Sequence, residues 1–488
     1  MFTTAPLFGK FHSPQAPADH LAQARAALHA HTLPQLHDIA AAFLPDACLA
    51  PKVSGLHSRQ RIYSRPITFW AFLSQILSPD SSCRKAVQLV QSLYASAPEP
   101  RSIASSTSPY CQARAHLCLT DLDGLRDQLA SEARRGLPQP WPGIERRILL
   151  VDGTTLLLPD TLENQLLYPQ PAFQKPGCAF PILRLVCLCD LVSGSVVGRA
   201  RGTYVQAETR LFAHLWPHLK PKDIVVGDRL FCSFWTLASL GQRQVDTLFR
   251  LHSRRNKDFR QGTPLRRDQR LLQWPKPPVR SKEASPEQWA ALPSSVPVRL
   301  IRFRVRNREG QVQKIILATT LLDPVLWPAT VLAEMYARRW HIELCWDDLK
   351  TTLKMDYLSC LCPEMIHREL EMHLIGYNLL RCLMRDVAAT CHVPFARLSF
   401  KGTLDALEQF ASGLQRIPRS QRRRRQAYVL EMLASIADDL VPERPGRREP
   451  RCIKRRPKPY PLMTHPRHQM QDKPKSHPRP HRAKTAQR

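Results

Sequence analysis

The segment from Tyr336 to Lys350, which reads YARRWHIELCWDDLK, carries the residues best suited to chemistry in this chain. Its Tyr336, Arg339, Glu343 and Lys350 stand at offsets of 0, 3, 7 and 14. On a continuous α-helix, at roughly 100° per residue, all four fall within an arc of about 60°. One helix face would then present a carboxylate, two cations and a phenol. A carboxylate can bind a divalent metal ion and neighbouring cations can bind phosphates, a combination that can cut or join a nucleic-acid backbone.

Two aspartates follow short apolar runs. Asp152 closes the run ILLVD, and Asp228 closes IVVGD. These runs are typical of strands buried on both faces, and the carboxyl ends of such strands commonly form α/β active sites. Three neighbouring carboxylates repel one another, and two Mg²⁺ ions about 4 Å apart would compensate for that repulsion. The pattern therefore predicts that Asp152, Asp228 and Glu343 are catalytic and bind Mg²⁺, with Mn²⁺ able to substitute for it.

Each acid also has a purely structural interpretation. Asp152 could end a turn, since Asp before Gly is common there, and Asp228 could form a surface ion pair with Arg229. Glu343 could support its helix by pairing with Arg339. The neighbouring Asp347 and Asp348 are rivals, although they point about 40° and about 140° away from Glu343 on a regular helix. The three acids taken together favour the catalytic interpretation.

These motifs resemble the DDE transposases of bacterial insertion sequences, specifically the insertion sequence 4 family. The signature of that family, Tyr-x2-Arg-x3-Glu-x6-Lys, is matched without a gap. The stretches around Asp152-Gly153-Thr154 and Gly227-Asp228-Arg229, and the N-terminal Ser82-Cys83-Arg84, are also similar to it. The resemblance covers roughly residues 35 to 400.

The resemblance implies an α/β fold with an RNase H-like catalytic core, a mixed sheet flanked by helices, interrupted by a mostly β insertion. It implies that Asp152, Asp228 and Glu343 bind metal and that Tyr336, Arg339 and Lys350 bind DNA. In some relatives a tryptophan of the insertion stacks on a flipped base. The candidates here, among which the sequence does not choose, are Trp274, Trp289 and Trp327.

The expected organisation has four parts. Residues 1–135 form a helical N-terminal DNA-binding region, and residues 136–400 form the catalytic domain with its insertion at about 230–328. Residues 401–440 form a helical C-terminal region. Residues 441–488, rich in Lys, Arg and Pro, form a basic disordered tail. The interval from Asn256 to Pro297 shows little periodicity and is expected to be a basic loop.

The charge balance points to a polyanionic partner. The 488 residues include 71 Lys and Arg against 41 Asp and Glu, a formal net charge of +30. No apolar run approaches the roughly 20 residues that span a bilayer, and no signal peptide is evident, so we expect no membrane partner and a cytoplasmic, nucleoid-associated protein. The fourteen cysteines lack zinc-finger spacing and are expected to be reduced thiols.

The leading hypothesis is a cut-and-paste transposase. It would bind terminal inverted repeats of double-stranded DNA, cleave the element ends, and join them to target DNA as a homodimer. Two alternatives remain open at this point: a structure-specific nuclease on the same fold, and a DNA-binding relic that has lost catalysis.

Overall fold

The structure is a computed structural model of the whole chain. It describes residues 62–95, 102–252, 259–306, 312–414 and 420–443, with a few isolated residues outside these ranges (43, 44, 49, 255, 416–418, 463, 465, 466 and 469). Most of the basic tail predicted for residues 441–488 and most of the first 61 residues therefore lie outside the described residues.

Helices precede the sheet, as the sequence predicted. Apolar residues at helical spacing bury one face of α4, including Phe69, Phe72 and Ile76. The predicted helical stretch 107–132 forms two helices, because the chain bends at Leu117–Cys118. The bounds are α4 (Arg65–Leu77), α5 (Cys83–Ala95), α6 (Ser108–Ala115) and α7 (Leu119–Arg134).

The first five strands form a mixed sheet in the order β3-β2-β1-β4-β5. β1 pairs antiparallel with β2 and parallel with β4, and β4 pairs parallel with β5. A hairpin turn through Ser193-Gly194-Ser195 joins β2 to β3. This mixed sheet flanked by helices confirms the predicted fold class. The bounds are β1 (Ile148–Leu157), β2 (Ile182–Asp190), β3 (Val196–Thr203), β4 (Ile224–Gly227) and β5 (Asp246–Arg250).

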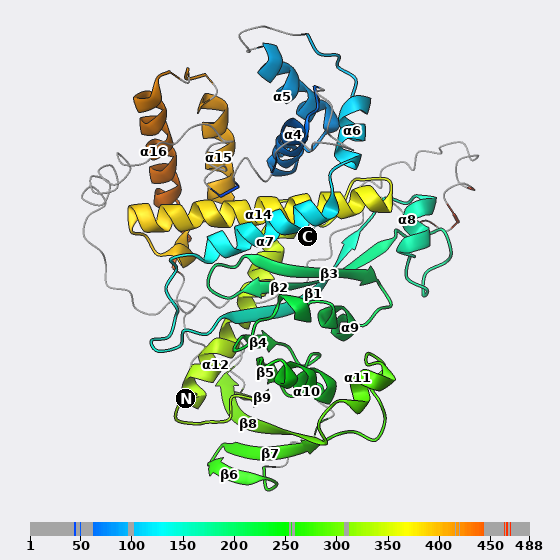
Figure 1. Cartoon of the computed structure of the whole chain (residues 1–488), viewed down its shortest axis with the longest axis vertical. Coiled ribbons are helices and arrows are strands. Elements are labelled where there is room, and N and C mark those ends of the chain that lie inside the picture. The colour runs from blue at the N-terminus through cyan, green and yellow to red at the C-terminus, as the bar shows by residue number, and fades with distance from the viewer. Residues whose placement is uncertain are drawn as a thin grey trace, which may run out of the picture.

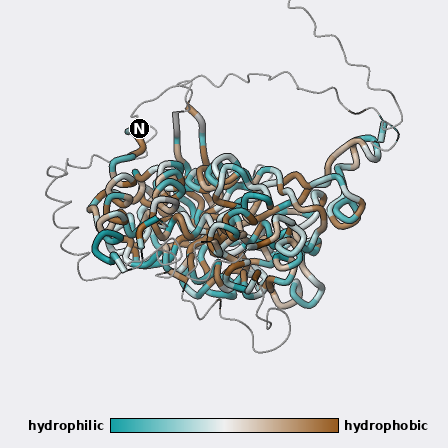
Figure 2. The backbone as a smooth tube through the Cα atoms, turned by 90° about the horizontal axis from the view of Figure 1, so that it is seen from above, coloured by the Kyte–Doolittle hydropathy of each residue, from teal (hydrophilic) through white to brown (hydrophobic). Residues whose placement is uncertain are grey.

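Both faces of this sheet are buried. Along β1, Ile148 and Leu150 pack into one apolar cluster with α7 and α14, whereas Leu149 and Val151 pack into another with α9 and α10. Figure 1 shows α7 and α14 on one side of the sheet and α9 and α10 on the other. Figure 2 shows the apolar segments gathered inside the bundle. The bounds are α8 (Leu162–Leu167), α9 (Glu208–Ala213), α10 (Phe234–Gln242) and α14 (Pro363–Cys391).

Four more strands continue the same sheet beyond β5, in the order β9-β8-β7-β6. The expectation of a basic loop over Asn256–Pro297 is wrong, since this interval contains β6, β7 and α11. Polar residues and Pro264 hide the alternation of apolar and polar residues along β6. α11 is short and starts at a capping box formed by Ser285 and Gln288, a polar pattern that resembles a loop. The bounds are β6 (Thr263–Arg266), β7 (Gln269–Pro275), α11 (Pro286–Ala290), β8 (Ser295–Arg306) and β9 (Val312–Thr319).

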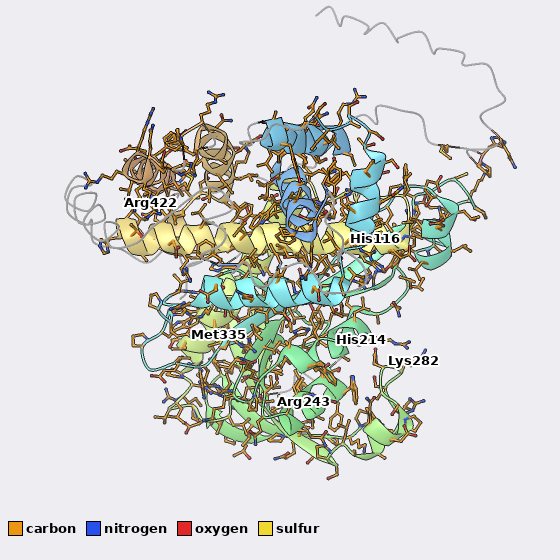
Figure 3. The ribbon with its side chains drawn as sticks, turned by 45° about the horizontal axis from the view of Figure 1, so that its top comes forward. His116, His214, Arg243, Lys282, Met335 and Arg422 are labelled. Atoms are coloured by element: carbon orange, nitrogen blue, oxygen red, sulfur yellow. The ribbon has the colours of Figure 1, made fainter. Side chains whose placement is uncertain are left out.

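Two helices follow α14 and pack on it: α15 (Phe400–Leu414) and α16 (Arg422–Asp438). The run of four arginines at 422–425 would suit contact with DNA phosphates if all four were exposed. Arg422 is exposed at the start of α16 (Figure 3), as are the next two arginines. Arg425 is buried instead and donates to the carbonyl oxygens of Leu414 and Ile417, at 3.2 and 2.6 Å. The Arg425 guanidinium therefore supplies hydrogen bonds to backbone carbonyl groups at and just after the end of α15, and it is unavailable to DNA.

Among the described residues, no cysteine forms a disulfide. No helix within the described residues is long and apolar enough to cross a membrane.

Candidate active site

Asp152 lies in the middle of β1, not at the carboxyl end of the strand as the sequence suggested. β2 pairs along the whole of β1, with Asp152 opposite Cys187, so the strand continues to Leu157. The pairing with β4 ends at Val151 and Gly227. Beyond that point β1 has no strand partner on its β4 side until Leu157, which forms a parallel bridge with Tyr357. The stretch from Asp152 to Leu156 is called the free edge of β1.

Asp228 is the first residue after β4 and thus lies beside the free edge. Its Oδ1 accepts a hydrogen bond from the backbone N–H of Leu230 at 2.7 Å, which orders the turn after the strand. Because Val151 and Gly227 are register partners, the next residues along each strand are the two aspartates. The sequence prediction that parallel strands bring Asp152 and Asp228 to one place is supported by this register.

The signature segment is not the single regular helix that the sequence predicted. It consists of α12 (Ala329–Ala337), a 3₁₀ turn η2 (Arg338–Trp340), α13 (His341–Asp347) and a π-helical turn η3 (Asp348–Thr352). The arc of about 60° assumed a uniform helix, and the two changes of pitch break that assumption. π-helical turns occur frequently at functional sites, and this one contains Lys350.

Glu343 and Arg339 still face one another across α13. Arg339 Nη2 lies 3.5 Å from Glu343 Oε1, and Arg339 also shares a side-chain hydrogen bond with Tyr336. Burial raises the pKa of Tyr336, while the Arg339 charge opposes that rise and the Asp228 charge adds to it. Arg339 thus contacts both Tyr336 and Glu343, and the charge of Asp228 acts on Tyr336.

Trp346 and Lys350 attach this segment to β1. The indole Nε1 of Trp346 donates to Asp152 Oδ2 at 3.2 Å. Lys350 Nζ donates to Thr154 Oγ1 and Thr155 O at 3.3 and 3.2 Å and pairs with Asp356 at 2.9 Å. The sequence could not indicate the Trp346–Asp152 hydrogen bond, because side-chain contacts between distant elements leave no local pattern.

The rivals Asp347 and Asp348 have other partners. Asp347 is exposed and accepts from Thr351 Oγ1 at 2.9 Å within its own helix. Asp348 pairs with Arg381 of α14 at 3.1 Å. Neither carboxylate is paired with β1. Of the tryptophan candidates, Trp274 is buried, and Trp289 and Trp327 are half-buried.

The Asp152 carboxyl is held in an unfavourable environment. Burial raises its pKa from the ordinary value to about 6, and the Glu343 charge adds to this. The backbone N–H of Gly153, the Arg339 charge and the Trp346 indole oppose the rise. A carboxylate whose charge is poorly compensated by the protein is suited to receiving a cation.

We expect the Asp152→Asn variant to be more stable than the wild type at pH 8 in the absence of divalent cations. The pKa of Asp152 is higher in the folded chain than the ordinary value near 3.8. Its ionisation therefore costs nothing below about pH 4 and destabilises the fold progressively as pH rises through about 6, by about 1–3 kcal/mol. Asparagine avoids that cost and can still accept the Trp346 hydrogen bond.

Thermal unfolding followed by circular dichroism at pH 4.5 and pH 8, with EDTA present, would measure this difference. The exposed Asp347→Asn is the matched control and should melt like the wild type at both pH values. A variant of Asp152 that is no more stable than the wild type at pH 8 would contradict the proposed environment of this carboxyl.

A separate basic cavity of about 480 Å³ lies between α9, α10 and the segment before α11. Its walls include His214, Lys282 and Arg243, labelled in Figure 3, together with Arg210. Glu283 is the acid in the lining, and it is hydrogen-bonded to Thr209 at 3.0 Å. The charge of this cavity suits a phosphate. Its residues come from three separate elements, so no sequence motif could indicate it.

Comparison with known proteins identifies the family. The family described as "Transposase DDE domain" matches residues 143–379, a range that contains all six predicted site residues. The chain is also 25% identical over 363 residues to the transposase InsG of insertion sequence element IS4 from Escherichia coli K12, covering 69% of this chain and 76% of that protein. Residues 143–379 of the chain therefore correspond to the DDE domain of this transposase family. The resemblance to the insertion sequence 4 family is thereby confirmed.

Two further similarities are weaker. This transposase is 29% identical over 139 residues to the putative transposase InsZ of Escherichia coli K12, covering 28% of this chain and 46% of that protein. A solved structure of piggyBac transposase in a synaptic complex with hairpin DNA is similar with a TM-score of 0.40 and 9% identity, over 88% of this chain and 85% of that one.

A transposase DDE domain implies DNA as a partner and the use of divalent metal ions in general. The available ligands fit such an ion, because Asp152, Asp228 and Glu343 offer hard oxygen donors and Asp152 is poorly compensated. Within the described residues, no three His, Cys, Asp or Glu side chains gather closely enough to hold a metal ion. Joint ligation by the three acids therefore requires their carboxylates to move closer together.

Proposed function

We propose that this transposase catalyses cut-and-paste DNA transposition with Mg²⁺ as its metal. The supporting observation is the approach of three acids to the free edge of β1: Asp152 within the strand, Asp228 after the adjacent strand, and Glu343 on the helix joined to Asp152 through Trp346. Asp152 and Asp228 belong to the sheet and Glu343 to a helix packed on it, and a DNA backbone could bind between them.

In this proposal Asp152, Asp228 and Glu343 hold the divalent cations. When bound, these cations activate the attacking oxygen and stabilise the leaving oxygen at phosphorus. Hydrolysis breaks one P–O bond at the element end and leaves a free 3′-hydroxyl. In the second reaction that hydroxyl replaces the 3′-oxygen of a target phosphodiester, so one P–O bond forms as another breaks.

Arg339, Lys350 and Tyr336 are the proposed DNA contacts. Arg339 is close to Glu343, so its charge can neutralise a phosphate held beside the acids. Lys350 donates to two β1 oxygens and pairs with exposed Asp356, and a phosphate bound here would replace one of these partners. We further propose that the chain binds terminal inverted repeats and acts as a homodimer that holds two element ends together, in the bacterial cytoplasm.

The test uses the purified full chain with DNA carrying the natural flanks of the coding region. Mg²⁺-dependent cleavage at the element ends, followed by joining to a target plasmid, is the expected result, with Ca²⁺ supporting binding alone. Cleavage of branched DNA without end specificity would favour a structure-specific nuclease. Binding without cleavage in Mg²⁺ or Mn²⁺ would indicate an inactive relic.

A further inference from the structure

A fourth acid, Glu208, lies beside the free edge of β1. It is the first residue of α9, the short helix that follows β3 and packs on β2 and β3. Figure 1 shows α9 directly against the end of the sheet formed by β1, β2 and β3. Neither the signature motif nor the two aspartate motifs includes Glu208.

The Glu208 side chain occupies the space where a side chain of residue 153 would be. A Cβ atom added to Gly153 would lie 2.5 Å from Glu208 Cδ, 2.7 Å from its Oε2 and 2.9 Å from its Cγ. Atoms that are not bonded to each other do not approach so closely, so only glycine is compatible with this position of the carboxylate. The residue after Asp152 is thus in direct contact with Glu208.

Side chains alternate along a strand, so Glu208 approaches from the face opposite to the Asp152 side chain. The missing partner on the β4 side leaves this part of β1 open at its edge. Asp228, which follows β4, lies close enough to Glu208 for their charges to repel. Glu208 is therefore a neighbour of Asp228 at this edge, on the face of β1 opposite to the Asp152 side chain.

The Glu208 carboxylate has little structural reason to be there. It is half-buried, and no hydrogen bond or ion pair to it is found among the described residues; the charge of Arg184 acts on it only as a neighbouring group. A carboxylate in the first turn of a helix stabilises that helix by interacting with its dipole. It can do so while the side chain is exposed to solvent. It requires neither contact with β1 nor proximity to a second carboxylate.

We propose that Glu208 is a fourth acidic residue of the active site, which shares with Asp228 the binding of a divalent cation at the free edge of β1. This inference rests on the proposed metal-dependent function. It assigns Gly153 a definite role as well, because the absence of a side chain there admits the Glu208 carboxylate.

Binding of Mn²⁺ to the purified full chain, followed by the electron paramagnetic resonance signal of the free ion, tests the proposal without any need for cleavage. We expect Glu208→Gln to weaken the affinity for Mn²⁺ by about tenfold or more, the scale on which supporting ligands act. Glu163→Gln is the matched control, since Glu163 is also in the first turn of a short helix and is exposed. Its Mn²⁺ affinity should equal that of the wild type.

A second comparison separates this contact from a general effect of altering β1. Gly153→Ala should weaken Mn²⁺ binding in the wild type, because the new methyl group displaces the carboxylate. In a Glu208→Ala background, Gly153→Ala should cause no further loss of affinity for Mn²⁺. Equal losses in the two backgrounds, or wild-type Mn²⁺ binding by Glu208→Gln, would overturn the proposal. If the wild type itself neither bound Mn²⁺ nor cleaved DNA, the proposed function would fail together with it.

Discussion

Replacing Glu343 with glutamine is expected to reduce cleavage at the element ends by about 10³-fold or more while DNA binding persists. The substitution keeps the shape of the side chain and removes the negative charge that lies 3.5 Å from Arg339. Loss of one principal electrostatic group from an active site costs rates of this order. DNA binding depends mainly on cations that neutralise phosphates, so removing an acid should leave it intact or slightly stronger.

The measurement combines a gel assay of cleavage with fluorescence anisotropy of DNA binding. Asp347→Asn is the control from the same segment, because its exposed carboxylate bonds to Thr351 of its own helix. We expect its cleavage rate to stay within about twofold of the wild type, on the scale of surface substitutions. If Asp347→Asn were the inactive variant and Glu343→Gln remained active, the third acid would be misassigned.

The contrast between these two acids also shows what the sequence could predict. Glu343 was identified because it is one of four chemically distinctive residues that are spaced as in the family signature. Their spacing in the sequence does not depend on the pitch of the helix that they form. The pitch itself could not be predicted. η2 and η3 differ from a regular helix by their hydrogen-bond pattern, which depends on packing against β1 and α14 more than on local composition.

Contacts between elements that are distant in sequence were the hardest to predict. The apolar runs before Asp152 and Asp228 predicted two buried strands, and the register of β1 with β4 brings the two aspartates to one edge. Whether Asp152 ended its strand depended on β2, whose pairing extends β1 by five residues beyond it. The contact of Glu208 with Gly153 joins residues far apart in sequence, and a glutamate at a helix start has no distinctive pattern of its own.

The residue expected to matter most for stability is Glu371, in the middle of α14. Its side chain is completely buried and pairs with Arg126 of α7 at 2.7 Å and with Arg199 of β3. The two arginines also share Asp123, at 2.9 and 2.8 Å. α7 and α14 lie side by side over the sheet in Figure 1, so this network joins both helices to β3.

We therefore expect Glu371→Gln to destabilise the fold by about 3 kcal/mol, because it leaves the buried Arg126 and the partly buried Arg199 with an incomplete set of counter-charges. The midpoint of urea unfolding would measure the loss. Glu364→Gln, on an exposed position of the same helix, is the control and should change stability by less than about 1 kcal/mol.

The same network connects the N-terminal helices to the catalytic sheet. Arg199 lies on β3, which leads directly into the turn before α9 and Glu208. A partial loss of stability at Glu371 should therefore loosen α7 against the sheet without touching any of the three acids. Such a variant, assayed well below its melting temperature, should keep its Mn²⁺ affinity. If Glu371→Gln unfolded at the same urea concentration as Glu364→Gln, the buried charges would be compensated by Asp123 and Asp127 alone.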